Sequence, residues 1–288
     1  MTWVLLSLLA GLADAVRDSI SKKASTTTPR ALVTWSYSLC ALPFFLPGMV
    51  RNIPADLPLE FWALLVFVSS CHVGGGLALV KALQISDLSL CIPMMAFTPV
   101  FLLVVGPALT GDAPTFSAIV GAVLVTCGSY VLNLGKARDG IIAPIRALLS
   151  ERGARIMLGL ALLWSITGSI DRIAMRHYDL SFWASAQLSM IAILLLPFVL
   201  RAGVLKVKSL KEAATHMLSL GTANALSLGA YLIALQTAPV HYVVCLKRSN
   251  ILFAVVLGRL FFAEKAVAAR LPGALLMLLG VIVISFSR

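Results

Sequence analysis

Two stretches of the chain decide the fold: residues 82–106 read ALQISDLSLCIPMMAFTPVFLLVVG, and residues 234–258 read ALQTAPVHYVVCLKRSNILFAVVLG. A shift of 152 positions aligns them without a gap, and the match extends into the apolar segment that follows each stretch. The identical pairs include Phe101 with Phe253, Val104 with Val256, Gly106 with Gly258, Gly121 with Gly273 and Gly128 with Gly280. An ungapped match that keeps glycines and a glutamine in register indicates an internal duplication.

The composition places this duplication in a membrane. Of the 288 residues, 60% are apolar and only 12% are charged, and the mean hydropathy is +0.97. A soluble domain averages roughly 45–50% apolar residues. The net charge of +11 is therefore interpreted as basic loops that face anionic lipid, and we expect the lipid bilayer and no nucleic acid as a partner.

The apolar segments have the length of bilayer-spanning helices, which need about 20 mostly apolar residues. The ten predicted spans are 2–22, 30–50, 60–82, 88–110, 114–134, 155–176, 181–200, 214–237, 239–262 and 268–286. The first span lacks a basic leader and is expected to be a mature helix. A basic stretch, 136–153, separates a first five-helix repeat, 1–135, from a second, 154–288.

Five helices per repeat is an odd number, so the second repeat must be inverted in the membrane. The expected fold is therefore an all-α integral membrane protein with ten transmembrane helices in two inverted repeats. Inverted repeats are typical of secondary transporters, whose substrate site lies near the middle of the membrane between the repeats.

Lys247 and Arg248 are adjacent cations within the ninth predicted span. Each charge costs roughly 2.5–3.5 kcal/mol at the centre of a membrane helix. The aligned residues of the first repeat are Met95 and Ala96, so the pair breaks the symmetry of the duplication. A requirement of the fold would tend to appear in both repeats, and the pair is therefore predicted to bind a substrate.

The duplication resembles the EamA-type proteins of the drug/metabolite transporter superfamily. The residues that carry the resemblance are Gly106, Asp112, Gly121 and Gly128 in one repeat and Gly258, Glu264, Gly273 and Gly280 in the other. The resemblance covers nearly the whole chain. It implies a transporter, in a superfamily that exports amino acids, drugs and metabolites and exchanges sugar phosphates and nucleotide sugars. Lys247 and Arg248 look like the Lys-Arg pair with which the triose-phosphate and sugar-phosphate translocators bind phosphate.

The charges inside the predicted spans have an excess of cations. The cations are Arg17, Arg172, Lys247, Arg248 and Arg259, and the acids are Asp14, Asp18 and Asp171. With Arg259 extended to the interface, a net charge of about +1 is expected in the interior, which a bound anion would balance. Asp171 lies at a depth that would let it pair with Lys247 or Arg248. The alternative is a permanent salt-bridge cluster of Asp171, Arg172 and these two cations.

Polar residues on several predicted helices recur with helical spacing and would line a central cavity. The predicted substrate-binding residues are Lys247, Arg248, Asn250, Asp171, Arg172, Trp164, Asn224 and His72, and the candidates for proton coupling are Asp14 and Asp18. Two of these residues have alternative interpretations. Trp164 would serve equally as an anchor at the lipid interface, and His72 as an interior histidine with its hydrogen bonds satisfied.

The favoured function is a secondary transporter that moves a small phosphate- or carboxylate-bearing anion by alternating access. The alternative is a proton-coupled exporter of amino acids or amphipathic drugs that uses Asp14, Asp18 or Asp171. No nucleophile with a base and no metal-ligand spacing is evident, and the five cysteines lie in apolar segments. We therefore expect neither an enzyme nor a cofactor or metal.

The expected location is a bacterial inner (plasma) membrane, which a monomer or homodimer would cross many times. Loops on the side of the termini hold only Arg51, Arg176 and Arg288, whereas the other side holds most of the basic loop residues. The positive-inside rule then predicts that both termini lie outside. Related ten-helix proteins are generally drawn with their termini inside.

Overall fold

The computed structural model describes residues 2–24, 30–85, 94–134, 151–201, 207–262 and 271–286. Within these ranges all regular structure is helical, which confirms the all-α class. The helices are α1 (Thr2–Ala24), α2 (Arg30–Leu39), the 3-10 helix η1 (Leu42–Phe44), α3 (Leu46–Arg51), α4 (Leu59–Ile85), α6 (Thr98–Thr110), α7 (Phe116–Leu134), α9 (Arg152–His177), α10 (Leu180–Arg201), α11 (Val207–Thr237), α12 (Val240–Lys247), α13 (Asn250–Phe262) and α14 (Leu271–Ser285).

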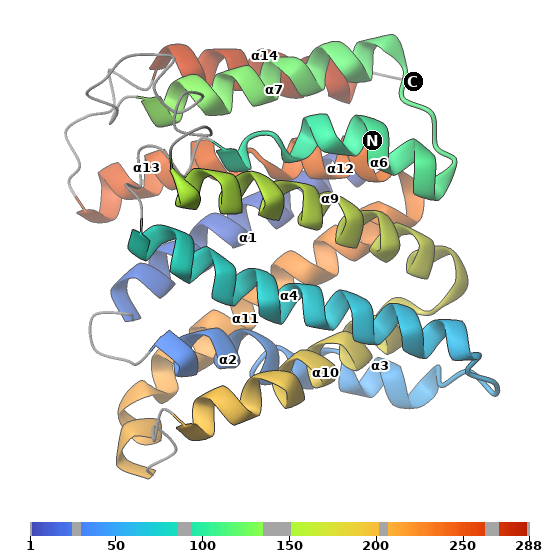
Figure 1. Ribbon diagram of the computed structural model, residues 1–288, viewed down its shortest axis with the longest axis vertical. Helices are drawn as coiled ribbons and strands as arrows, with labels where there is room; N and C mark the ends of the chain where they lie inside the picture. Colours follow the sequence, from blue (N-terminus) through green and yellow to red (C-terminus); the bar gives the residue numbers. More distant parts are fainter. Residues whose placement is uncertain are drawn as a thin grey trace.

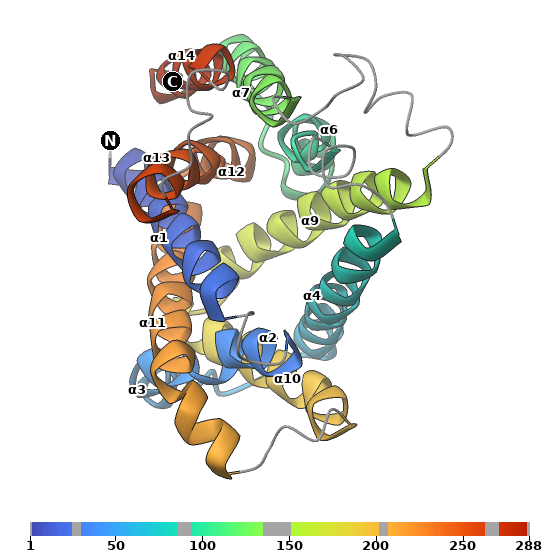
Figure 2. The same cartoon turned by 90° about the vertical axis from the view of Figure 1, so that its left-hand side faces the viewer.

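Successive spans run in opposite directions between two ends of the molecule, as Figures 1 and 2 show. Four described segments are long and apolar enough to cross a membrane: Leu59–Leu79, Arg152–His177, Leu180–Arg201 and Ala214–Thr237. Shorter apolar helices occupy four of the other six expected spans, at Leu32–Phe44, Thr98–Thr110, Phe116–Val131 and Pro272–Ser285. Of the expected basic linker, only 151–153 lies within the described residues.

The last helices of the two repeats, α7 and α14, lie side by side at the top of Figure 1. Their duplicated glycines face each other: a Cβ on Gly128 would lie 2.6 Å from the backbone nitrogen of Met277, and one on Gly280 would lie 2.7 Å from the carbonyl oxygen of Gly121. Small residues allow this close approach of helix backbones in a membrane. The glycines that occupy matching positions in the two repeats therefore allow α7 and α14 to pack closely.

Two aligned spans are broken at the same place in each repeat. A turn at Ala96 and Phe97 precedes α6, and a turn at Arg248 and Ser249 separates α12 from α13. The expectation of continuous spans at 88–110 and 239–262 is corrected at these points. In the first repeat Pro99 lies in the first turn of α6. Because proline has no N–H to donate to the carbonyl oxygen four residues earlier, it is tolerated there but would interrupt a continuous helix.

The second repeat has Ile251 at the position of Pro99, so its break depends on tertiary packing. A Cβ on Gly11 of α1 would lie 2.8 Å from the carbonyl oxygen of Lys247 and 2.9 Å from Oγ of Ser249. The backbone of α1 thus lies directly against the turn. The absence of a side chain at Gly11 lets a helix from one repeat cover the break in the other.

Replacing Gly128 by Ala is expected to lower the stability of the protein by about 1–3 kcal/mol, because the new methyl group would overlap backbone atoms of α14. Thermal unfolding of the detergent-purified protein, followed by intrinsic fluorescence, measures this. The matched control is Gly76→Ala in α4, where a Cβ meets no heavy atom within 4 Å. Equal unfolding temperatures for the two variants would contradict the packing argument.

Candidate substrate site

Lys247, the last residue of α12, is held by two other helices. Its Nζ lies 3.1 Å from Oδ2 of Asp14 on α1 and 4.7 Å from the centroid of the Tyr231 ring on α11. The ammonium group thus has a carboxylate and an aromatic face as partners. The ninth span is joined through this cation to the first and eighth spans.

Asp14 is the centre of the polar cluster, and its side chain is only 9% exposed. While Oδ2 binds Lys247, Oδ1 lies 2.9 Å from Nη1 of Arg17 and accepts a 2.6 Å hydrogen bond from Oγ of Ser227 on α11. Arg17 also pairs with Asp18 at 3.0 Å. Asp14 therefore compensates the charge of Lys247, and Asp14 and Asp18 both pair with Arg17.

Asn224 enters the same network from α11. Its Oδ1 accepts a 3.1 Å hydrogen bond from Nη1 of Arg17, and its Nδ2 donates to the carbonyl oxygen of Tyr37 at 3.0 Å. The guanidinium of Arg17 also lies 5.4 Å from the Tyr37 ring centroid. Asn224 was predicted to bind substrate. In the structure it contacts Arg17, which pairs with Asp14, and Asp14 in turn pairs with Lys247.

Arg248 differs from its neighbour because it reaches no carboxylate among the described residues. Its Nη2 donates a 2.8 Å hydrogen bond to Oγ1 of Thr98, and its Nε has no hydrogen-bond partner in this part of the chain. Thr98 begins α6 directly after the break in the first repeat. The contact therefore joins the two broken spans to each other across the repeats.

Asn250, the first residue of α13, occupies the position equivalent to Thr98. Its Oδ1 is buried and finds no hydrogen-bond partner among the described residues. Lys247, Arg248 and Asn250 thus all lie within one turn of the break. The break itself, which brings Arg248 to Thr98, was not predicted.

Asp171 makes different contacts from those expected. It is 4% exposed and accepts hydrogen bonds from Nε1 of Trp183 at 3.0 Å and from Nε2 of Gln187 at 3.1 Å. It forms no described ion pair with Lys247 or Arg248, so the expected pairing is not present. Two donors from α10, the helix that follows α9, occupy the place expected for the cations.

Arg172 points away from Asp171, because adjacent residues of a helix differ in direction by about 100°. Its Nε lies 3.3 Å from Oδ2 of Asp112, and its Nη1 donates to the carbonyl oxygen of Leu235. The alternative of a permanent four-charge cluster with Asp171, Lys247 and Arg248 is therefore also not observed. Arg172 belongs to a separate network at the end of α9.

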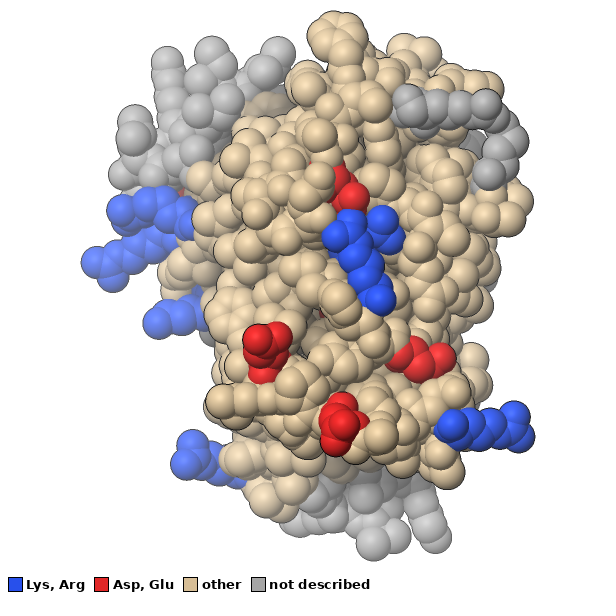
Figure 3. Space-filling model, turned by 90° about the vertical axis from the view of Figure 1, so that its right-hand side faces the viewer, with Lys and Arg blue, Asp and Glu red and all other residues tan. Residues whose placement is uncertain are grey.

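This end network ties the loop after α6 to the second repeat. Arg176 lies 2.7 Å from Oδ2 of Asp112 and donates to the carbonyl oxygen of Thr110 at 2.7 Å. Close by, Thr115 and Tyr242 share a 3.0 Å hydrogen bond. Figure 3 views this end, on which the charged side chains are few and scattered. The duplicated acid at position 112 was recognised in the sequence, but its two arginine partners were not.

The pairing of Arg172 with Asp112 changes the expected charge balance. The cations that remain in the central cluster are Arg17, Lys247 and Arg248, and the acids are Asp14, Asp18 and Asp171. With the three carboxylates ionised, their formal charges add to zero. The expected interior charge of about +1 is therefore wrong for the described residues, and a bound anion is not needed for overall neutrality.

His72 and Trp164 are both partly buried. The imidazole of His72 is within electrostatic range of Lys247. Trp164 faces α4, where a Cβ on Gly75 would lie 3.6 Å from its Nε1. On the same face of α9, a Cβ on Gly168 would lie 3.1 Å from the Tyr231 hydroxyl. Tyr231 thus contacts both Lys247 and α9, a role that sequence reasoning missed.

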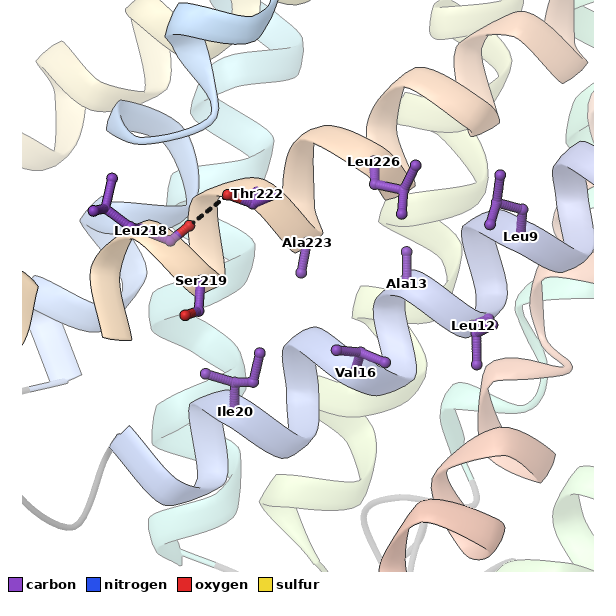
Figure 4. Close-up of a pocket in the computed structure, with 10 residues that line it drawn as sticks. All are labelled: Leu9, Leu12, Ala13, Val16, Ile20, Leu218, Ser219, Thr222, Ala223 and Leu226. Atoms are coloured by element: carbon purple, nitrogen blue, oxygen red, sulfur yellow. Dashed lines mark hydrogen bonds between the residues drawn. The ribbon is translucent and has the colours of Figure 1, made fainter. Parts of the chain in front are cut away.

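A separate groove of about 500 Å³ runs between α1 and α11. Figure 4 shows its lining of mostly apolar side chains, including Leu9, Val16 and Leu226, and the Thr222 hydroxyl bonded to the carbonyl oxygen of Leu218. None of the predicted substrate-binding residues is among those that line it. The groove therefore does not coincide with the central polar cluster.

Comparison with known proteins agrees with this architecture. The profile of the EamA-like transporter family matches residues 1–134 and 152–286. A solved structure titled “Crystal structure of protein” superposes with a TM-score of 0.77, covering 98% of this chain and 95% of that chain at 16% identity, and so supports the fold alone. No curated protein matches the chain. The chain belongs to the EamA-like transporter family, and it is an integral, multi-pass membrane protein.

Replacing Asp14 by Ala is expected to lower the free energy of unfolding by about 2–4 kcal/mol, because Lys247 would keep its burial and lose its carboxylate partner. Asp18→Ala is the matched comparison, since Asp18 is 54% exposed and its one ion pair among the described residues is with Arg17. Its loss should lower the free energy of unfolding by under about 1 kcal/mol. Denaturant titration of both variants in detergent measures the difference. A larger loss for Asp18→Ala would contradict the central place of Asp14.

Proposed function

We propose that this member of the EamA-like transporter family moves a small anionic metabolite, bearing phosphate or carboxylate, by alternating access. The proposal rests mainly on the surroundings of the Arg248 side chain. Arg248 is a cation in the interior of a membrane protein, it reaches no carboxylate among the described residues, and it lies where two broken spans meet. Ionisable residues inside a membrane protein commonly mark substrate or ion pathways.

The helix breaks add to the attraction for an anion. Thr98 begins α6 and Asn250 begins α13, and the first peptide N–H groups of a helix carry partial positive charge. Helices interrupted at the middle of the membrane present such ends to anionic substrates in secondary transporters. The guanidinium of Arg248 would bind two oxygens of a phosphate or carboxylate, and Lys247 would add a second positive charge.

The other predicted residues divide into two groups. Asn250, His72 and Trp164 remain candidates for contact with substrate, and Asp171 and Asn224 position the surrounding helices through their hydrogen bonds. Arg172 is left out of the proposed substrate site, because Asp112 and a backbone carbonyl already hold its guanidinium. We assign it to the network that closes the end of the molecule where α9 finishes.

The alternative is a proton-coupled exporter of amino acids or amphipathic drugs, and one observation favours it. Asp171 is a buried carboxylate whose described partners, Trp183 and Gln187, are neutral donors. A carboxylate in such a place is suited to carrying a proton or to meeting an ammonium group. In this alternative Asp171→Asn abolishes transport and Lys247 and Arg248 are dispensable.

We further propose a bacterial inner membrane as the location, with the more basic end of the molecule in the cytoplasm. The exposed cations Arg152, Arg155 and Arg201 lie at this end, and the exposed acids Asp56, Glu60 and Asp179 lie at the other. Positively charged loops stay in the cytoplasm. The assembly is proposed to be a monomer or a homodimer.

This orientation predicts the side of the C-terminus. In a bacterial host, a C-terminal alkaline phosphatase fusion should be active and a C-terminal green fluorescent protein fusion dim, because α14 ends on the less basic side. Fusions placed after Arg201, at the basic end, should behave in the opposite way. A bright fluorescent C-terminal fusion would reverse the assignment.

Replacing Lys247 or Arg248 by Ala should reduce anion uptake into proteoliposomes on the order of 100-fold, since losing one charged partner in a buried site removes a few kcal/mol of binding. The first measurement is a thermal-shift panel with inorganic phosphate, phosphoenolpyruvate, malate, leucine and ethidium. The anion that stabilises the wild type most is then used in radiolabelled form for uptake.

The matched control is Arg155→Ala, which removes an exposed cation at the basic end and should leave uptake unchanged. Normal uptake by both Lys247→Ala and Arg248→Ala would overturn the proposal. Stabilisation by leucine or ethidium, with transport lost in Asp171→Asn alone, would establish the alternative.

A further inference from the structure

We infer that Asp14 is an internal counter-ion that lets the empty carrier change conformation, so that the protein catalyses net transport and does not require exchange. The inference rests on the proposed function, because it concerns how the proposed anion site behaves when no anion is bound. It attributes the capacity for net transport to the carboxylate of Asp14, which lies on the repeat that does not contain Lys247.

The geometry makes Asp14 a substitute for substrate. Its Oδ2 lies 3.1 Å from Nζ of Lys247, which is where an oxygen of a bound phosphate or carboxylate would lie. The opposite oxygen, Oδ1, keeps Arg17 at 2.9 Å and Ser227 at 2.6 Å. A substrate that displaces Asp14 from Lys247 therefore leaves the carboxylate with a cation and a hydroxyl donor.

The ion pair between Asp14 and Lys247 also persists when the carrier switches from opening on one side of the membrane to opening on the other. Gly11 brings the backbone of α1 against the turn between α12 and α13, with a Cβ position only 2.8 Å from the carbonyl oxygen of Lys247. Asp14 follows Gly11 by three residues, slightly less than one turn of the same helix. Close packing of this kind moves as a unit in a rigid-body transition, so Lys247 keeps its partner throughout.

The charge balance gives the reason for net transport. An unpaired cation is expensive to enclose away from water, so a carrier whose cations depend on substrate would change conformation only when loaded. Here Asp14 compensates Lys247 and shares Arg17 with Asp18, while the Thr98 hydroxyl holds Arg248. With Asp171 included, the formal charges of the cluster add to zero. The empty carrier is thus formally neutral and is able to return without cargo.

The experiment compares uptake of labelled inorganic phosphate into proteoliposomes that are empty or loaded with unlabelled phosphate. The wild type should take up phosphate into both at rates within about threefold. Asp14→Asn should retain uptake into loaded vesicles and lose on the order of 100-fold into empty ones, because Lys247 then needs an anion to be enclosed. The same variant should bind phosphate more tightly in a thermal-shift titration, since the internal competitor is removed.

Two further variants serve as controls. Asp14→Glu keeps the countercharge and should retain uptake into empty vesicles. Asp56→Asn removes an exposed acid far from the cluster and should leave the ratio of the two rates at the wild-type value. If Asp14→Asn does not fold, the ratio of uptake rates into empty and loaded vesicles, measured for the wild type and for Asp14→Glu, still tests the inference.

The outcomes separate this inference from the function on which it rests. A wild type that takes up phosphate only into loaded vesicles overturns the inference and leaves anion transport intact, as does an Asp14→Asn variant with the wild-type ratio. If the wild type neither transports phosphate into either kind of vesicle nor is stabilised by any anion of the panel, the proposed function falls and the inference falls with it.

Discussion

The ion pair between Asp14 and Lys247 is the interaction on which the interior of this protein depends. It joins the first span of one repeat to the broken ninth span of the other, and its carboxylate also holds Arg17 and Ser227. In a bilayer an ammonium group at this depth needs a partner within the protein. The single carboxylate therefore fixes the position of α1 relative to both α11 and α12.

The duplication provides a symmetric scaffold, and the site arises where the two repeats differ. Both repeats interrupt the same span at aligned positions, and in both the last helix packs through glycines. Only the second repeat places cations at its break, and Arg248 reaches from there to Thr98 at the break of the first. A symmetric framework thus holds two adjacent cations that only the second repeat supplies and that contact residues of the first.

Predictions from the sequence succeeded where one local property decided the outcome. The positions of the apolar segments followed from their length, and the duplication was recognised from glycines that the structure places in the contact between α7 and α14. Pairing between distant charges was predicted less well. Asp171 and Arg172 were expected beside Lys247, yet adjacent residues on one helix point to different neighbours, and α10 and the loop at Asp112 supply their partners.

The sequence by itself determined the class, the spans, the inverted duplication and the presence of an unusual cation pair, because hydropathy and register are properties of single residues and of their spacing. Only the tertiary structure decided which charges meet. Asp14 lies 233 positions before Lys247 in the chain, and no local pattern links them. Their contact depends on the close approach of α1 at Gly11 to a helix break that packing, and not proline, maintains. The consequence is that Lys247 is compensated by a carboxylate, whereas Arg248 contacts only the Thr98 hydroxyl among the described residues.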